Sequence, residues 1–156
     1  MEQKIRVLLI CHGNICRSPM AEYIMKKLVL DRGFEDKFYI ESCATSTEEI
    51  GNDVYPPARR QLEKMSIPCP RRRARQVRRE DYDNFDYIIG MDSYNIANLN
   101  RFFTDSKSKI YKLLSFTGSN RDVSDPWYTG DFEKCYEDIL AGCEAFLKTI
   151  QVHIVS

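Results

Sequence analysis

Cys11 and Arg17 lie in one short segment whose residue types favour anion chemistry. Cys11 directly follows the apolar run of residues 5–10, and Gly13 and Arg17 lie in the stretch that leads to Pro19. The planar guanidinium of an arginine can hold two oxygens of a phosphate-like group. Positive surroundings that attract an anion also stabilise a thiolate, the reactive form of cysteine. The segment therefore predicts a phosphate-like ligand held beside a nucleophilic cysteine.

The secondary-structure elements predicted on either side of this segment are suited to binding an anion. The apolar run predicts a buried strand that ends on Cys11, and a loop over residues 12–18 follows. Ser18 is expected to cap a helix that opens with Pro19, whose missing N–H costs nothing at the first helical position. Backbone N–H groups at a helix start are unsatisfied and partly positive, so they favour an anion. Strand, loop and helix start together predict a phosphate-binding loop.

Spacing alone does not make this loop, because Cys69 and Arg75 repeat the same spacing in a different setting. That second copy follows no predicted strand, opens no helix and contains no glycine. It also contains Pro70, which has no N–H to donate. In the first copy, Gly13 allows close backbone approach and Asn14 suits a left-handed position. The strand, the glycine and the helix start around the first copy, rather than the spacing, predict that it binds phosphate.

Apolar periodicity along the rest of the chain alternates between strand and helix. Further strands are expected over residues 37–43, 85–91 and 109–113, with polar loops over 44–55 and 115–130. Helices are expected from Pro19 to Gly33, from Pro56 to Met65, from Asp92 or Ser93 to Phe103, and from Phe132 to Ile150. This order predicts an α/β fold with a central parallel four-stranded sheet flanked by helices on both faces. At 156 residues, the chain is expected to form a single domain, residues 1–156.

Composition narrows the class of protein. The 23 basic and 23 acidic residues cancel, so no global charge favours nucleic acid or membranes. The arginine-rich run of residues 71–79 has no interleaved aromatic residues and is interpreted as a solvated loop. Six cysteines without a signal-peptide pattern or a membrane-length apolar run indicate reduced thiols in the cytoplasm. The absence of a CxxC pair makes a metal site unexpected.

The residues now permit a comparison with a known family. The loop Cys11-His12-Gly13-Asn14-Ile15-Cys16-Arg17-Ser18-Pro19 resembles the phosphate-binding loop of the low-molecular-weight protein tyrosine phosphatases. The similarity extends to the region 74–77, to the strand before Asp92, and to Asp125-Pro126-Trp127-Tyr128. It covers almost the whole chain.

This resemblance implies a mechanism. Cys11 would attack phosphorus and form a cysteinyl-phosphate intermediate, while Arg17 and the loop amides hold the equatorial oxygens. Asp125 would protonate the leaving phenolate and then activate the hydrolytic water. The substrate would be a phosphotyrosine protein or a small aryl phosphate, no cofactor would be needed, and we expect a monomer. Ser18 would donate a hydrogen bond to the Cys11 sulfur, and Ser42 and Asp92 would support the loop. Trp127 and Tyr128 would line the substrate entrance.

Structural alternatives exist for several of these residues. Asp125 can be a turn residue before Pro126, Asp92 can simply cap a helix, and Trp127 and Tyr128 can be core aromatics. His12 can lie at the pocket mouth or be a bystander. An arginine-phosphate phosphatase, an arsenate reductase of the same fold, and an inactive phosphotyrosine-binding or redox-sensing module are competing functions. Ile15 and the aromatic pair favour an aryl ester over arginine phosphate, and residues 75–91 lack the cysteines of a reductase relay.

Two further expectations concern regulation and the loop's surroundings. The resemblance implies that Cys16 can form a disulfide with Cys11 and protect it from over-oxidation. The family commonly has a histidine at the position of Arg72. We hypothesise that Arg72 instead pairs with Glu22 on the first helix.

Overall fold

The computed structural model describes the backbone of residues 3–155 and the side chains of residues 3–150. Four parallel strands form one sheet in the order β2-β1-β3-β4. Their bounds are β1 Ile5–Cys11, β2 Phe38–Ala44, β3 Tyr87–Gly90 and β4 Ile110–Lys112. The prediction of a central parallel four-stranded sheet is confirmed.

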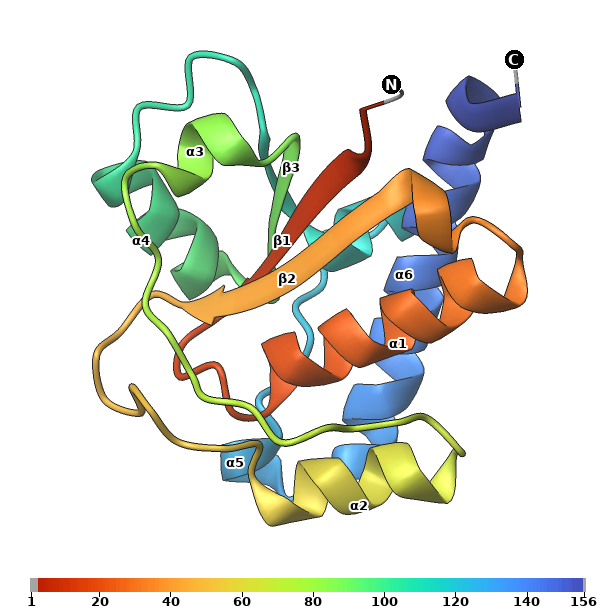
Figure 1. Ribbon diagram of the computed structural model, residues 1–156. Coiled ribbons are helices and arrows are strands. Elements are labelled where there is room, and N and C mark those ends of the chain that lie inside the picture. The colour runs from red at the N-terminus through yellow and green to blue at the C-terminus, as the bar shows by residue number, and fades with distance from the viewer. Residues whose placement is uncertain (1–2, 156) are drawn as a thin grey trace.

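Helices cover both faces of this sheet (Figure 1). In Figure 1, α1 and α6 lie on one face with α2 packed beside them, while α3 and α4 lie on the other. None of the described helices is long and apolar enough to cross a membrane. The helix bounds are α1 Arg17–Asp31, α2 Pro56–Lys64, α3 Asp81–Asn84, α4 Ser93–Phe102, α5 Pro126–Thr129 and α6 Phe132–Val155, with 3₁₀ turns η1 Glu35–Lys37 and η2 Leu113–Thr117.

Successive side chains of the central strand β1 point alternately into two hydrophobic cores, one on each face of the sheet. Val7 and Leu9 belong to the cluster that contains the apolar residues of α1, α2 and α6. Leu8 and Ile10 belong to the cluster on the other face, with Leu99 of α4. All four side chains are fully buried. Burial on both faces explains why β1 is a continuous apolar run rather than an alternating one.

The strand order places a crevice beside Cys11. From β1 the chain crosses to β2 on one side and then returns to β3 on the other side of β1. Ligands of open α/β sheets bind at such a switch point, beyond the carboxyl ends of the strands. Cys11 ends β1, and Asp92 follows β3. The fold therefore brings these two residues to the same edge.

Two local predictions are wrong. Helix α1 begins at Arg17 with Cys16 at its N-cap position, not at Pro19 with Ser18 as the cap. Ser18 is unavailable for capping because its hydroxyl contacts Asn14 and Cys11. The predicted loop over 115–130 contains the short helix α5, and α3 was likewise not predicted. One-turn helices are too short to show a periodic apolar pattern.

Candidate active site

Cys11 lies at the base of the loop between β1 and α1 and is almost fully buried. Its sulfur accepts a hydrogen bond from the backbone N–H of Asn14 (3.2 Å). Ser18 Oγ lies 3.0 Å from the same sulfur. Because Asn14 Nδ2 donates to Ser18 Oγ (2.8 Å), the hydroxyl proton of Ser18 remains available for the sulfur. Two donors thus converge on Cys11, as the stabilisation of a thiolate requires.

Asn14 holds the loop in shape from a fully buried position. Its φ of 61° is left-handed, as the sequence suggested. Its side-chain amide also donates to Ser42 Oγ (3.0 Å), and Ser42 in turn donates to Glu22 Oε1 (2.5 Å). The contacts place Ser42 of β2 in the support of the loop.

Arg72 completes this support, but through other partners than expected. Its Nη2 donates to Asn14 Oδ1 (2.7 Å) and its Nη1 to the carbonyl of Asn14 (3.0 Å). Nη2 also lies 3.3 Å from Ser42 Oγ. Among the described residues, Arg72 forms no ion pair with Glu22, whose carboxylate binds Ser42 and Lys26. The hypothesis of a direct pair is wrong, because Ser42 lies between them.

Arg17 is buried at the first position of α1 and surrounded by acceptors. Its Nη1 donates to Asp92 Oδ2 (2.7 Å) and to the carbonyl of Val123 (2.9 Å). Its Nη2 lies 3.4 Å from Asp125 Oδ2. Burial alone would lower the pKa of Arg17, but the negative charges of Cys11, Asp125 and Asp92 outweigh it and raise the pKa. Arg17 is therefore a permanent cation beside the cysteine.

The contacts of Arg17 leave one edge of its guanidinium available. Both close contacts use Nη1, and the 3.4 Å contact to Asp125 is the remaining one among the described residues. Nε and Nη2 form the paired edge that binds two oxygens of a phosphate. Arg17 is thus fixed at one end and free to bind at the other.

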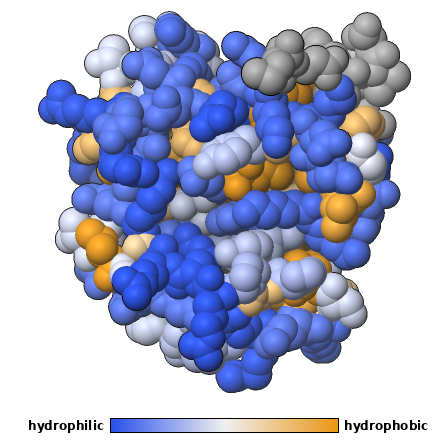
Figure 2. Space-filling view, in the orientation of Figure 1, coloured by the Kyte–Doolittle hydropathy of each residue, from blue (hydrophilic) through white to orange (hydrophobic). Residues whose placement is uncertain are grey.

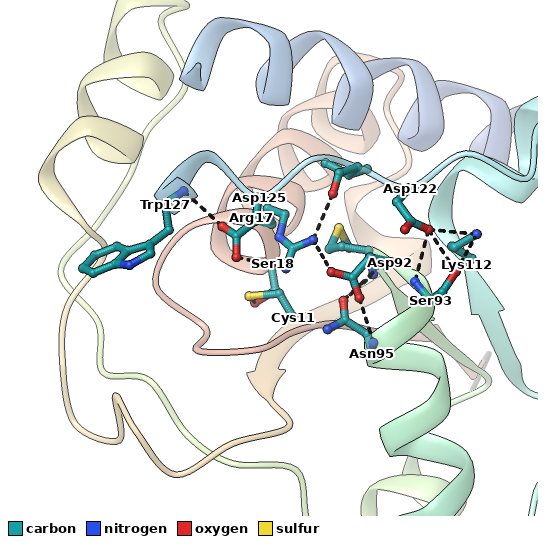
Figure 3. A network of polar contacts seen from close by, with 12 residues as sticks. Cys11, Arg17, Ser18, Asp92, Ser93, Asn95, Lys112, Asp122, Asp125 and Trp127 are labelled. Carbon is teal, nitrogen blue, oxygen red and sulfur yellow. Dashed lines mark hydrogen bonds and ion pairs between the residues drawn. The ribbon is translucent and has the colours of Figure 1, made fainter. Parts of the chain in front are cut away.

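Asp125 enters the site from a distant part of the chain (Figure 3). It is the N-cap of α5, and its Oδ1 accepts from the backbone N–H of Trp127 (3.1 Å). Figure 3 shows its carboxylate between Trp127 and the guanidinium of Arg17, with the Cys11 sulfur close by. Asp125 keeps a quarter of its side chain exposed. A carboxyl group in this position can exchange a proton with a bound group and with water.

Two anchors hold the chain just before Asp125. Asp122 Oδ1 accepts from Ser93 N (3.1 Å), Ser93 Oγ (3.1 Å) and Lys112 Nζ (2.9 Å). Arg121 forms a two-pronged ion pair with Asp138 of α6, at 2.9 and 3.1 Å. Partial burial raises the pKa of Asp122, but the bonds from Lys112 and Ser93 outweigh it and lower the pKa. Sequence reasoning singled out neither anchor, because each joins residues far apart in the chain.

Asp92 both caps a helix and contacts Arg17. Its carboxylate accepts from Asn95 N (2.8 Å) in a capping box at the start of α4. The other carboxylate oxygen binds Arg17. The two interpretations of Asp92 are therefore compatible.

A pocket of about 140 Å³ opens in front of the cysteine. Trp127 and Tyr128 line it and remain half and largely exposed, so they are not core aromatics. The ring of Trp127 packs on Tyr55, with 4.8 Å between the centroids. The lining residues are Cys11, His12, Gly13, Ile15, Cys16, Arg17, Glu48, Glu49, Asp125, Trp127 and Tyr128.

Glu48 and Glu49 form an acidic rim that sequence analysis missed. Glu48 pairs with His12, which places His12 at the pocket mouth. A Cβ on Gly13 would lie 3.3 Å from the side chain of Glu49. Both glutamates follow β2, and the rule that ligands bind at the carboxyl ends of strands could have identified them.

Cys16 lies in the pocket wall and is buried. Burial, with the nearby negative charges of Cys11 and Asp125, raises its pKa far above the usual thiol value. It is thus a neutral thiol at pH 7. All six cysteines lie among the described residues and are free. Within that part of the chain, no group of three or more His, Cys, Asp or Glu residues could hold a metal ion.

Comparison with known proteins identifies one family. The family model described as "Low molecular weight phosphotyrosine protein phosphatase" matches residues 6–155. The low molecular weight protein-tyrosine-phosphatase YfkJ of Bacillus subtilis is 41% identical over 150 residues, covering 94% of this chain and 96% of that protein. The low molecular weight phosphotyrosine protein phosphatase of Rattus norvegicus is 41% identical over 148 residues, covering 91% and 93%.

The same similarity appears in three dimensions. The crystal structure of YfkJ from Bacillus subtilis superposes with a TM-score of 0.93 at 40% sequence identity. The match covers 97% of this chain and 98% of that one. The α/β fold is therefore shared over nearly the full length of both chains.

Proposed function

The chain belongs to the low molecular weight phosphotyrosine protein phosphatases, and on that premise we propose how its residues perform the reaction. The observation that carries the proposal is the convergence of Cys11, Arg17 and Asp125 on one pocket. A nucleophile, a fixed cation and a proton donor are the groups that phosphate-ester hydrolysis through a covalent intermediate needs. The substrates are phosphotyrosine proteins or small aryl phosphates.

In the first step, the Cys11 thiolate attacks phosphorus and the bond from phosphorus to the phenolic oxygen breaks. Ser18 and the Asn14 amide lower the energy of the thiolate before attack. Arg17 binds two equatorial oxygens through Nε and Nη2 while Asp92 and Val123 hold Nη1. Asp125 gives its proton to the leaving oxygen, so that tyrosine departs as a neutral phenol.

In the second step, water hydrolyses the cysteinyl-phosphate. Asp125, now a carboxylate, takes a proton from the water as its oxygen attacks phosphorus. The bond from sulfur to phosphorus breaks, which releases inorganic phosphate and restores the Cys11 thiolate. Asp125 is protonated again at the end of the cycle, so the atoms and charges balance.

The pocket wall supports an aryl group over a phosphorylated guanidinium. Ile15 presents an apolar side chain to the pocket, and Trp127 flanks the opening. A flat aromatic ring binds favourably against such apolar surfaces, whereas a guanidinium group needs polar hydrogen-bond partners. Arginine phosphate is the second candidate substrate, and a direct comparison of the two esters decides between them.

We further propose a monomer in a reducing cytoplasm, without nucleic-acid partners. The free state of all six cysteines supports a reducing compartment. On the face shown in Figure 2, hydrophobic residues form only small, separate patches, which does not favour a permanent partner there.

Turnover of an aryl phosphate in the presence of a chelator tests the activity. We expect hydrolysis by the parent protein, none by Cys11→Ser, and a phosphorylated Cys11 peptide after acid quenching of the reaction. Turnover by Cys11→Ser at a rate comparable to that of the parent protein, or a phosphate found on another residue, would contradict the assignment of the nucleophile.

Reversible oxidation is a separate proposal for Cys16. Peroxide converts a reactive thiolate to a sulfenic acid, and a neighbouring thiol can condense with it and release water. Cys16 lies in the same pocket wall as Cys11. We expect the parent protein to regain its activity after peroxide and then thiol, and Cys16→Ser to regain much less. Equal recovery would show that Cys16 gives no protection.

A further inference from the structure

We propose that a groove beside the phosphate pocket binds an acidic side chain of the substrate, next to the phosphotyrosine in its sequence. The proposal rests on the proposed function and adds a preference for the flanking peptide. The groove has a volume of about 300 Å³. The lining residues that matter are His12, Thr45, Ser46, Asn98, Arg101 and Phe102.

The groove and the phosphate pocket share one lining residue. His12, the neighbour of the nucleophile, lines both cavities. Ser46 donates to the carbonyl of His12 from its backbone N–H (3.1 Å) and from its hydroxyl (2.9 Å). Thr45 N donates to the carbonyl of Cys11 (3.0 Å). One wall of the groove is thus hydrogen-bonded directly to the phosphate loop, so residues that flank a phosphotyrosine held at Cys11 are within reach of it under this proposal.

The charge of the groove comes from an arginine without an acidic partner. Arg101 is exposed on α4, and its Nη1 donates to Asn98 Oδ1 (3.3 Å). Among the described residues, no carboxylate pairs with Arg101, whereas Arg17, Arg59, Arg75 and Arg121 all have one. An unpaired guanidinium beside an active site is a ready partner for a carboxylate.

The rest of the pocket mouth has the opposite charge. Glu48 and Glu49 line the phosphate pocket but not the groove. An acidic side chain next to phosphotyrosine would be repelled by these glutamates and attracted by Arg101. The charges therefore favour one direction of the peptide across His12.

An unsatisfied hydroxyl supports the same assignment. Thr45 Oγ1 is the one buried side-chain nitrogen or oxygen atom among the described residues that has no hydrogen-bond partner. A buried hydroxyl without a partner is costly, and native proteins contain few. Phe102 adds an exposed aromatic surface on the α4 side. A polar group lacking a partner, a cation and an apolar surface are together suited to a peptide side chain and its backbone.

The test compares phosphotyrosyl peptides that differ only in one residue, Asp or Asn, placed either directly before or directly after the phosphotyrosine. On one of the two sides we expect the parent protein to have a kcat/KM about threefold higher on the Asp peptide than on the Asn peptide, mainly through KM, because a single exposed ion pair has about this effect. The ratio should fall to about one in Arg101→Gln and shrink with added salt. An equal ratio in the parent and in Arg101→Gln would overturn the proposal.

Arg60→Gln is the matched control. Arg60 is an exposed arginine without an ion pair among the described residues, and it lies on α2, on the opposite face of the sheet from α4. We expect Arg60→Gln to keep the threefold ratio of kcat/KM between the Asp and Asn peptides. If this ratio fell to about one in Arg60→Gln as well, the net charge of the protein, and not the groove, would set the preference for the Asp peptide, and the proposal would be overturned.

Thr45→Val probes the groove without changing its charge. We expect KM to rise for both peptides while the melting temperature is unchanged or higher, since valine removes an unsatisfied polar group. A lower melting temperature with unchanged KM would show that the hydroxyl serves the fold instead. Turnover of a small aryl phosphate by the parent protein tests the proposed function separately, so the two proposals can fail independently.

Discussion

The phosphate loop and the segment that carries Asp125 meet at Arg17, but the structure holds them in opposite ways. In the loop, Asn14, Ser18 and Arg17 are almost fully buried, and each side chain has several partners. The loop is also a contiguous stretch between a strand and a helix. Its geometry is therefore set before any substrate binds.

The Asp125 segment is more exposed than the loop, although Pro126 is buried and the ring of Trp127 packs on Tyr55. Trp127 is about half exposed and Tyr128 largely exposed. The anchors at Arg121, Asp122 and Val123 all precede Asp125. Asp125 itself contacts Arg17 only at 3.4 Å.

This difference corresponds to the two tasks in the reaction. Charge stabilisation works best with donors that are already in place, because no reorganisation is then needed in the transition state. A general acid must reach a different leaving oxygen in each substrate and then a water molecule. The comparison predicts that changes in the loop affect all substrates alike, whereas changes in the Asp125 segment depend on the leaving group.

The largest effects should come from Cys11 and Asp125, the proposed nucleophile and the proposed general acid. Cys11→Ser should lower kcat by a factor on the order of 10⁴ to 10⁶, equally for all leaving groups. Asp125→Ala should lower kcat by about 10² to 10⁴ for poor leaving groups and far less for good ones. Rates across a series of substituted phenyl phosphates measure both. A uniform loss in Asp125→Ala would contradict its role as general acid.

Asn14→Ala should show how much the loop depends on its buried support. The change removes the partners of Ser42 and Arg72 and leaves alanine in a left-handed conformation. We expect the free energy of unfolding to fall by about 2–4 kcal/mol, measured by denaturant titration. Asn52→Ala is the control, because Asn52 is exposed and its side chain binds only Glu49 among the described residues. A similar loss in both variants would mean that the loop is not specially supported.

Asp122→Asn should loosen the base of the Asp125 segment. The variant loses the charge that binds Lys112. We expect kcat to fall by roughly threefold to tenfold for poor leaving groups, with good ones nearly unaffected, because only the placement of the acid changes. Asp83→Asn is the control, since Asp83 is exposed on α3. A loss that is the same for every leaving group would argue against the distinction between the two regions.

Asp138→Asn should have the smallest effect on activity and a measurable one on stability. Burial raises the pKa of Asp138, but the bonds from Arg121 and Lys134 outweigh it and lower the pKa. A lowered carboxyl pKa contributes stability above the unfolded value of about 3.9, and this is lost as the pH falls through the folded value. We expect Asp138→Asn to cost about 1 kcal/mol at pH 7, since both cations are half exposed.

The loss of stability caused by Asp138→Asn should disappear at acidic pH. Thermal melts of the parent and of Asp138→Asn should converge as the pH falls below about 4. A difference in melting temperature that persists at low pH would show that shape, rather than charge, is the contribution of Asp138.

Much of the fold follows from local patterns in the sequence. The apolar run of β1 and the regular period of α6 predicted their elements because each pattern is repeated over many residues. The one-turn helices α3 and α5 carry too few residues for such a pattern. The start of α1 was misplaced because Ser18 binds Cys11 and Asn14 rather than capping the helix.

For the site, the sequence by itself was enough to propose the phosphate loop, because Cys11, Asn14, Arg17 and Ser18 are near neighbours whose context indicates their chemistry. Only the tertiary structure decided what surrounds them. The contact of Arg17 with Asp125, the bonds of Arg72 to Asn14, and the acidic rim of Glu48 and Glu49 all join distant parts of the chain. Such contacts depend on how strands and helices pack, so a local pattern can supply the nucleophile but not the partners that complete it.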